Sequence, residues 1–415
     1  PYNRALNVNA VGTAGSRRVR SGFFEINAPI FKQFEINLSG RYDDYSSGQS
    51  NFSPKVGAKF TPIPELAIRG TYSKGFRIPS FNEAFGLPTT GFVTRTLNPA
   101  VATQAAFIAA HGGNAYATNP FALGVIASGN PALSPEKSTS FTAGVIFEPI
   151  RNVSFTLDYW QIKIDGLIAA VTDTAPAFNA YYANNGVVNL PGLTVLPGVP
   201  DVAFPNALPQ IGFILSSYQN QDSQFASGID FGANARIQLT DGIRLTSSVD
   251  ASYQLKYELI SGGVTLDYAG TLSPCNITSC SGSPKLRANW QNTLEFGDTS
   301  VSATVYYTSG YDNASIDFGG IKGDCAFNAA NHSSVQTYND GSAILCEAKP
   351  TWNVDLTASQ RIGDNFLMYL NVLNVLDLKA PFDPSSTYQI FQFNPAWAGA
   401  NIMGRYFRIG AKIDF

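Results

Sequence analysis

The sequence predicts an all-β protein, an antiparallel transmembrane β-barrel, and three observations lead to this fold class. Apolar and polar residues alternate along segments of ten or more residues, which places them on opposite faces of a strand. Tight turns and long loops alternate between these segments. Charged residues form only 14% of the 415-residue chain and aromatic residues 13%, whereas an average soluble domain has about 25% charged residues.

Composition and motifs also exclude other classes of protein. No segment reaches the roughly 18 to 20 apolar residues that a transmembrane helix requires, so strands rather than helices would cross a membrane. The net charge of -3 gives no reason to expect a nucleic-acid partner. The sequence contains neither a Gly-x-Ser-x-Gly elbow nor a His–carboxylate pair at metal-ligand spacing, so it predicts no enzyme site and no cofactor.

The last segment of the chain shows the alternation most clearly. Its apolar parity holds Phe407, Ile409, Ala411, Ile413 and Phe415, and its other parity holds Arg408, Gly410, Lys412 and Asp414. The first face could meet lipid, whereas the second could meet only water or a polar interior. A single strand of a soluble sheet can show the same pattern, so the repetition of the pattern is what decides.

The same alternation recurs in segments 34–43, 244–256 and 285–296. Their length fits a tilted membrane-spanning strand of about 9 to 11 residues and exceeds the roughly 5 to 6 residues usual in soluble sheets. We count about fourteen strands, the first of them Arg4–Val11. In Ser154–Asp165 the parity changes around Tyr159–Trp160, which we interpret as a β-bulge.

Connections between the strands fall into two classes. We expect tight turns at Pro29–Lys32, Pro62–Glu65, Pro149–Asn152, Thr240–Gly242, Gly297–Thr299 and Ile362–Asp364, and long loops at Arg77–Pro135, Gly166–Gln224, Glu258–Pro284, Gly310–Pro350 and Asp377–Ile402. Short periplasmic turns on one rim and long extracellular loops on the other are typical of an outer-membrane barrel. The alternative is a soluble β-propeller or an array of sandwiches, which would need large structured insertions on one side only.

Two prolines and one asparagine at predicted strand ends have direct structural interpretations. Pro79 would end a strand because it cannot donate to the ladder, and Pro135 would stand at a strand start, where a missing donor matters little. Asn374 precedes a long loop, where its side chain can bond local backbone. These residues are therefore expected to shape the barrel rather than to contact a ligand.

Five strings, in the order of the chain, resemble TonB-dependent outer-membrane receptors. They are Phe52-Ser-Pro-Lys-Val-Gly-Ala-Lys-Phe60, Leu66-Ala-Ile-Arg-Gly-Thr-Tyr-Ser-Lys-Gly-Phe-Arg-Ile-Pro-Ser80, Asn130-Pro-Ala-Leu-Ser-Pro-Glu-Lys-Ser138, Ser227-Gly-Ile-Asp230 and Asn371-Val-Leu-Asn-Val-Leu-Asp377. The resemblance covers nearly all of the chain after about Ser21. It implies an energised importer of the bacterial outer membrane, whose barrel of about 22 strands surrounds a plug. Its cargo would be a scarce nutrient such as a siderophore, cobalamin, a glycan or a peptide.

For this chain the resemblance implies part of such a barrel. Residues 1–415 would be its C-terminal portion, with about 14 strands present of an expected 22 and no plug domain in this chain. The implied partners are outer-membrane lipid and lipopolysaccharide, the plug domain and first barrel strands, the TonB complex through the plug, and a small-molecule or oligomeric nutrient. Two other functions stay open, a passive outer-membrane pore and a structural or adhesion barrel that binds a cell-surface partner through its long loops.

The resemblance also suggests a role for the last residue. Phe415 lies on the apolar parity of the final strand. We expect it to face lipid and to act as a barrel assembly signal, as terminal residues do in this family.

Aromatic side chains in the long loops are the candidate ligand-binding residues. Flat aromatic faces can stack on sugars or on aromatic siderophore groups. The alternative is that these rings form the aromatic girdle or pack the loops against each other. The candidates are Tyr116, Tyr181, Tyr182, Tyr311, Tyr388, Phe391 and Trp397.

Four cysteines lie in the predicted loops, Cys275 and Cys280 in one and Cys325 and Cys346 in another. Four cysteines allow three disulfide connectivities, and pairing within each loop is the simplest. Disulfides persist in the periplasm and at the cell surface. The alternative is a metal site with thiolates from Cys275 and Cys280, but the two histidines, His111 and His332, lie in other loops.

Overall fold

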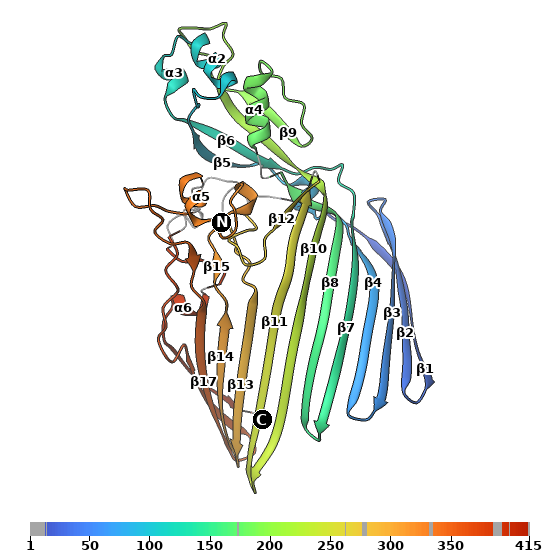
Figure 1. Cartoon of the computed structure of the whole chain (residues 1–415). Helices are drawn as coiled ribbons and strands as arrows, with labels where there is room; N and C mark the ends of the chain where they lie inside the picture. Colours follow the sequence, from blue (N-terminus) through green and yellow to red (C-terminus); the bar gives the residue numbers. More distant parts are fainter. Residues whose placement is uncertain are drawn as a thin grey trace.

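The computed structural model describes residues 13, 15–171, 174–261, 263–275, 280–331, 335–384, 392–397 and 399–413. Thirteen long strands form one antiparallel meander, in which each long strand pairs with the next (Figure 1). They are β1(Val19–Phe31), β2(Phe34–Tyr45), β3(Ser50–Ile63), β4(Leu66–Arg77), β7(Glu136–Ile150), β8(Val153–Ala170), β10(Ile211–Thr240), β11(Ile243–Ser261), β13(Leu286–Phe296), β14(Thr299–Thr308), β17(Thr351–Ile362), β18(Phe366–Leu373) and β19(Tyr406–Ile413). The prediction of an antiparallel all-β fold is confirmed.

The predicted count of about fourteen strands depends on the two ends of this meander. The predicted first strand, Arg4–Val11, lies outside the described residues, and so do Asp414 and Phe415. Within the residues that are described, no pairing joins β1 to β19. The expected role of Phe415 in assembly therefore stays a prediction.

All six predicted tight turns are confirmed, and Figure 1 places them at one rim, the lower one in that view. Beside the turns, the last paired residues of neighbouring strands are Phe31 with Phe34, Ile63 with Leu66, Ile150 with Val153, Thr240 with Ile243, Phe296 with Thr299 and Ile362 with Phe366. The long connections leave from the opposite rim (Figure 1). This asymmetry is the one expected of an outer-membrane barrel, with the turns in the periplasm.

The two faces of the sheet have the chemistry that their parity predicts. Large apolar side chains on one face are exposed along the whole meander, among them Leu38, Val56, Ile68, Val145, Leu157, Phe231, Trp290, Val301, Leu356, Leu370 and Ile409. Polar side chains occupy the other face, which we call the luminal face, where Lys59 Nζ lies 3.2 Å from Glu35 Oε1. An apolar exterior of this extent suits lipid rather than water.

The predicted β-bulge at Tyr159–Trp160 is wrong. β7 and β10 both pair with β8 through Tyr159 and Trp160 without a shift of register. The parity changes because β8 continues as far as Ala170, and a strand that rises out of the bilayer can expose polar residues on its outer face. A register shift occurs instead in β11, where Leu255 is left out between the pairs Ser227–Lys256 and Gly228–Gln254.

The two longest connections fold together into an extracellular unit that we call the loop module (Figure 1). Its small sheet contains β5(Thr89–Arg95), β6(Phe121–Ser128), the start of β10 and β9(Leu193–Pro197), with β6 and β10 parallel. Its helices are α2(Ala102–Ala110), α3(Ala115–Thr118) and α4(Ala175–Ala183), and α1(Phe81–Phe85) follows β4 directly. Its buried core consists of Leu97, Phe107, Ala117, Leu123, Ala177, Tyr181, Tyr182, Leu193, Ile211 and Ile214.

Three further connections, 268–285, 309–350 and 374–405, form what we call the second loop group. It contains β15(Tyr311–Asp312), η1(Ile316–Phe318), α5(Cys325–Asn331), β16(Glu347–Ala348) and α6(Gly399–Ile402), while β12(Val264–Asp267) extends the ladder of β11. A small core of Leu272, Cys275, Cys280, Tyr311 and Ala348 holds it together, with Trp397 packed against that core. Among the described residues no helix has the length and apolar character needed to cross a membrane.

The facing assignment predicts how arginine substitutions affect stability. Leu38 is exposed on the lipid face near the middle of β2, so Leu38→Arg should lower the free energy of unfolding in bilayers by about 2 to 4 kcal/mol. Phe34→Arg, at the periplasmic end of β2, should lower it by roughly 1 kcal/mol or less, because the penalty falls towards the interface. Ser39→Arg on the luminal face is the control, and urea titration in lipid vesicles is the measurement. Equal effects of Leu38→Arg and Ser39→Arg would show that the faces are assigned wrongly.

Candidate functional site

An ion pair on the luminal face spans three strands because the middle strand has no side chain there. Arg69 on β4 donates to both carboxylate oxygens of Asp158 on β8, at 2.9 Å and 2.6 Å. Between them lies Gly144 on β7, and a Cβ atom at Gly144 would stand only 1.9 Å from Asp158 Oδ1. A two-point arginine–carboxylate contact is among the stronger polar contacts in proteins. Gly144 therefore leaves the space that the Asp158 carboxylate needs to reach Arg69.

A second luminal glycine lies beside it, where a side chain of β8 reaches over the directly paired strand β10. The Trp160 indole from β8 passes over Gly228 on β10, where a Cβ atom would come within 2.5 Å of the ring. Its Nε1 donates to Asp230 Oδ1 at 3.1 Å, and Ser252 Oγ donates to the same oxygen at 2.6 Å. Side chains from β8 and β11 thus fix the Asp230 carboxylate from both sides.

Next to this crossing the luminal wall forms a hollow of about 590 Å³, which we call the mouth hollow. The polar side chains that line it are those of Thr156, Asp230, Asp250, Ser252, Arg287, Asn289, Tyr306 and Thr308, and Gly232 also lines it. Arg287 is the second residue of β13, at its extracellular end. On the outer face at the same level, the rings of Tyr307 and Trp352 lie 4.4 Å apart, as expected for an aromatic belt at the membrane interface.

The loop module is anchored to the barrel by residues of two of the family-like strings. Arg77, the last residue of β4, donates to Glu136, the first residue of β7, at 2.7 Å from both Nε and Nη2, and to Glu83 in α1 at 2.7 Å. Glu136 also accepts from the backbone N–H of Ile168 at 2.7 Å. Burial alone would raise the pKa of Glu83, but hydrogen bonds from Arg77 and Ser80 hold it below its usual value. The chain thus leaves and re-enters the barrel wall at one clamped point.

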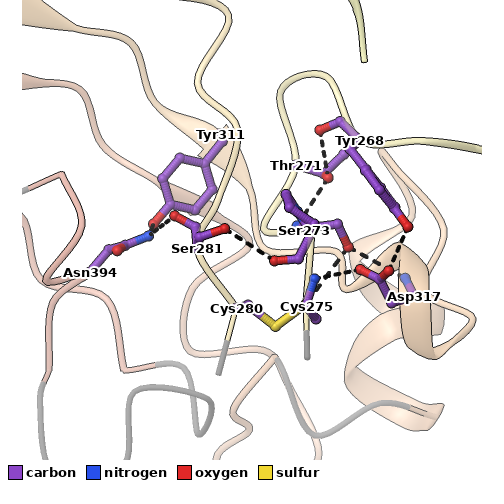
Figure 2. The surroundings of a disulfide bond; sticks show 10 residues. Tyr268, Thr271, Ser273, Cys275, Cys280, Ser281, Tyr311, Asp317 and Asn394 are labelled. Carbon is purple, nitrogen blue, oxygen red and sulfur yellow. Dashed lines mark hydrogen bonds between the residues drawn. A yellow bond between two sulfur atoms is a disulfide. The ribbon is translucent and has the colours of Figure 1, made fainter. Parts of the chain in front are cut away.

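The second loop group is tied by a carboxylate that reaches from one loop into the next (Figure 2). Asp317 accepts from the Tyr268 hydroxyl at 2.6 Å and from the backbone N–H of Cys275 at 2.7 Å. The structure joins Cys275 to Cys280 and Cys325 to Cys346, which is the pairing within each loop. Burial raises the pKa of Tyr268, and the neighbouring Asp317 carboxylate raises it further.

Tyr311 and Trp397, two of the predicted ligand-binding residues, lie together in this group. The Tyr311 hydroxyl donates to the buried Asp383 carboxylate at 3.2 Å and accepts from Asn394 at 2.7 Å. Trp397 Nε1 donates to the Ser281 carbonyl at 2.6 Å, and Figure 2 shows Ser281 beside Tyr311 and Asn394. The structure thus gives both aromatic residues a role in joining loops.

Three other predicted ligand-binding residues lie inside the loop module. Tyr181 and Tyr182 are 2% and 7% exposed, and burial together with nearby Tyr116 raises the pKa of Tyr181 to about 12. The Tyr116 hydroxyl donates to the Val199 carbonyl at 2.7 Å and accepts from the Gln210 N–H. These positions correspond to the loop-packing alternative, and a direct ligand contact stays a prediction. Tyr388 and Phe391 lie outside the described residues.

The residues of the mouth hollow were not predicted as a site. The sequence places Asp230 only in the family-like string Ser227–Asp230 and Arg287 only in the alternating segment 285–296, because a period of two says nothing about which strands become neighbours. No group of three or more His, Cys, Asp or Glu side chains that could hold a metal ion occurs among the described residues.

The crossing at Gly144 predicts a specific loss of stability. Gly144→Ala should lower the free energy of unfolding by about 1 to 3 kcal/mol, because its Cβ would displace Asp158 from Arg69 and would also lie 2.9 Å from the Leu157 carbonyl. Urea unfolding of the full-length protein in lipid vesicles measures this. The matched control is Gly22→Ala on β1, where nothing lies within 4 Å of the new Cβ. An Asp158→Ala background should shrink the effect of Gly144→Ala, and an unchanged effect there would contradict the proposed cause.

Comparison with known proteins gives the family. The family model described as TonB dependent receptor-like, beta-barrel matches residues 1–375. No curated protein matches the chain in sequence. Among solved structures, a mutant of the ferric enterobactin receptor PfeA from Pseudomonas aeruginosa has a TM-score of 0.57 at 14% identity, covering 96% of this chain and 45% of that one. The siderophore receptor PirA from Acinetobacter baumannii has a TM-score of 0.56 at 14% identity, with 96% and 46% covered.

The outer membrane transporter YddB from Escherichia coli has a TM-score of 0.52 at 10% identity, covering 96% of this chain and 45% of that one. This chain therefore spans less than half of the length of each of these three proteins. Identities this low establish a shared fold, whereas the family model extends over most of the chain. The chain thus belongs to the TonB-dependent receptor β-barrel family of the bacterial outer membrane.

Proposed function

We propose that this chain forms the extracellular mouth and much of the wall of an outer-membrane receptor that imports a scarce nutrient with energy supplied through TonB. The observation that carries the proposal is the mouth hollow, a polar site of about 590 Å³ on the luminal wall at the extracellular ends of β13 and β14. A pocket of this size is large enough for a small nutrient molecule. The folded loops above it limit which molecules enter.

The proposal includes the division of the whole receptor into parts. Residues 1–415 are the C-terminal portion of the barrel, and a plug domain and further strands complete it. Support comes from the lengths of the three structures, each more than twice that of the part matched here. Contact with TonB would be made through the plug, and lipid and lipopolysaccharide would surround the apolar outer face.

Siderophores are the first cargo class to test, because PfeA is described as a ferric enterobactin receptor and PirA as a siderophore receptor. Cobalamin, glycans and peptides remain the other classes that the proposal includes. The clamp at Arg77 bears on uptake of any of them, since the loop module is held to the barrel there. If the clamp were broken, the loop module would hold its part of the mouth in a less well-defined position.

The test is uptake by cells that carry the full-length gene, its deletion or its variants. With iron-loaded siderophores labelled with radioactive iron, uptake should require both this gene and TonB. Glu136→Gln removes the charge that Arg77 and the Ile168 N–H bind, and should lower uptake at limiting cargo by about tenfold. Glu148→Gln, an exposed position near the other end of β7, is the matched control.

Two results would contradict the proposal. Uptake that continues unchanged without TonB would mean that transport is not energised. A steady single-channel conductance of the purified full-length protein in planar bilayers would identify the passive pore instead.

A further inference from the structure

The mouth hollow brings together two opposite charges that are not paired with each other. Elsewhere on the luminal face many charged side chains are joined in pairs: Glu35 with Lys59, Arg41 with Asp43, Arg69 with Asp158 and Arg244 with Glu295. In the part of the chain that the structure describes, the Asp250 side chain makes no hydrogen bond or ion pair, and Arg287 makes only a cation–π contact. Both side chains line the hollow and are exposed to it.

Strand register explains why these two groups lie close without meeting. Arg287 on β13 is directly opposite Ser252 on β11, and Asp250 is two residues further along β11. Such diagonal neighbours have Cα atoms about 7 to 8 Å apart. The Arg287 guanidinium carbon lies 5.2 Å from the Trp397 ring centre, so the guanidinium is held on the indole of the second loop group. The gap between Arg287 and Asp250 remains part of the hollow.

The groups around Arg287 and Asp250 in the hollow are also polar. Asn289 lies directly opposite Asp250 and Tyr306 directly opposite Asn289, and in the described residues neither side chain makes a hydrogen bond. Trp160 and Ser252 already hold one oxygen of Asp230. The hollow therefore offers one guanidinium, two carboxylates and a neutral amide and phenol. A purely anionic molecule would meet two carboxylates of its own sign.

We propose that the mouth hollow binds a small zwitterion, a molecule or a molecular end that carries a carboxylate and an ammonium group a few ångströms apart. Arg287 would bind the carboxylate through two parallel N–H donors, the geometry that suits arginine best. Asp250 would accept from the ammonium, and Asn289 and Tyr306 would bind the polar atoms between the two charges. The inference rests on the proposed function, because it names the chemistry of the cargo group held at the mouth.

The test uses the purified full-length protein and three forms of one probe: free dialanine, N-acetyl-dialanine and dialanine amide. Saturation-transfer NMR gives their dissociation constants. Free dialanine should bind about tenfold more tightly than either capped form, since each cap removes one charged contact. Asp250→Asn should weaken binding of free dialanine about tenfold and leave N-acetyl-dialanine unchanged. Arg287→Gln should do the same for free dialanine and leave dialanine amide unchanged.

Matched controls separate these effects from a general loss of charge or of folding. Asp241→Asn and Arg361→Gln change the same residue types beside the periplasmic turns and should leave all three dissociation constants unchanged. Retention of the heat-modifiable folded form is checked for every variant on gels. Equal binding of the free and capped probes, or equal weakening of all three probes by Asp250→Asn, would overturn the inference.

The two proposals fail in different ways. Loss of selectivity for the zwitterion, with TonB-dependent uptake of another cargo intact, overturns only the assignment of the hollow. If the hollow selects the zwitterion but uptake does not depend on TonB, the assignment of the hollow stands and the proposed function is overturned.

Discussion

Backbone hydrogen bonding in hydrocarbon is the constraint on which the structure depends. No water is available there to satisfy an N–H or C=O group, so every such group must bond within the protein. The thirteen-strand ladder meets this need between its strands through continuous antiparallel pairing, and among the described residues only the outer edges of β1 and β19 lack a neighbouring long strand. Irregular backbone is confined to places outside the bilayer, and all described helices and short strands accordingly lie in the extracellular connections (Figure 1). Because the barrel wall must be a regular ladder, the irregular structure of the chain occurs in the loops.

The same constraint moves the polar chemistry to the luminal face. Neighbouring strands are only about 4.8 Å apart, so long side chains that reach across a strand need a position without a Cβ atom. Gly144 gives Asp158 that space towards Arg69, and Gly228 gives it to Trp160 towards Asp230. Glycines on the luminal face thus give long side chains room to lie across a neighbouring strand, and at Gly144 this lets side chains of the non-adjacent strands β4 and β8 meet.

How far the sequence predicts this structure depends on whether a feature is local. A period of two and turn residues are local, so the strands, the six tight turns and the two faces could be predicted. The bulge at Tyr159–Trp160 was predicted wrongly because the rule that apolar means outward holds only inside lipid. Tyr181 could not be distinguished from a surface aromatic residue, since its burial depends on segments thirty or more residues away in sequence, such as those of Ile211 and Leu97. The mouth hollow depends on register between β10, β11 and β13, which no single segment encodes.

The two sets of extracellular loops are held in different ways, and this difference affects the mouth hollow. The loop module has an apolar core of its own and joins the barrel through the clamp at Arg77. The second loop group has a smaller core and relies on two disulfides and on buried polar contacts such as Asp317 with Tyr268. Only the second group is seen to contact the hollow directly among the described residues, through Trp397 on Arg287. The position of the one guanidinium in the hollow is therefore set by a loop, whereas the position of Asp250 is set by the rigid wall. Ligand selection at the mouth consequently depends on how firmly the second loop group is held.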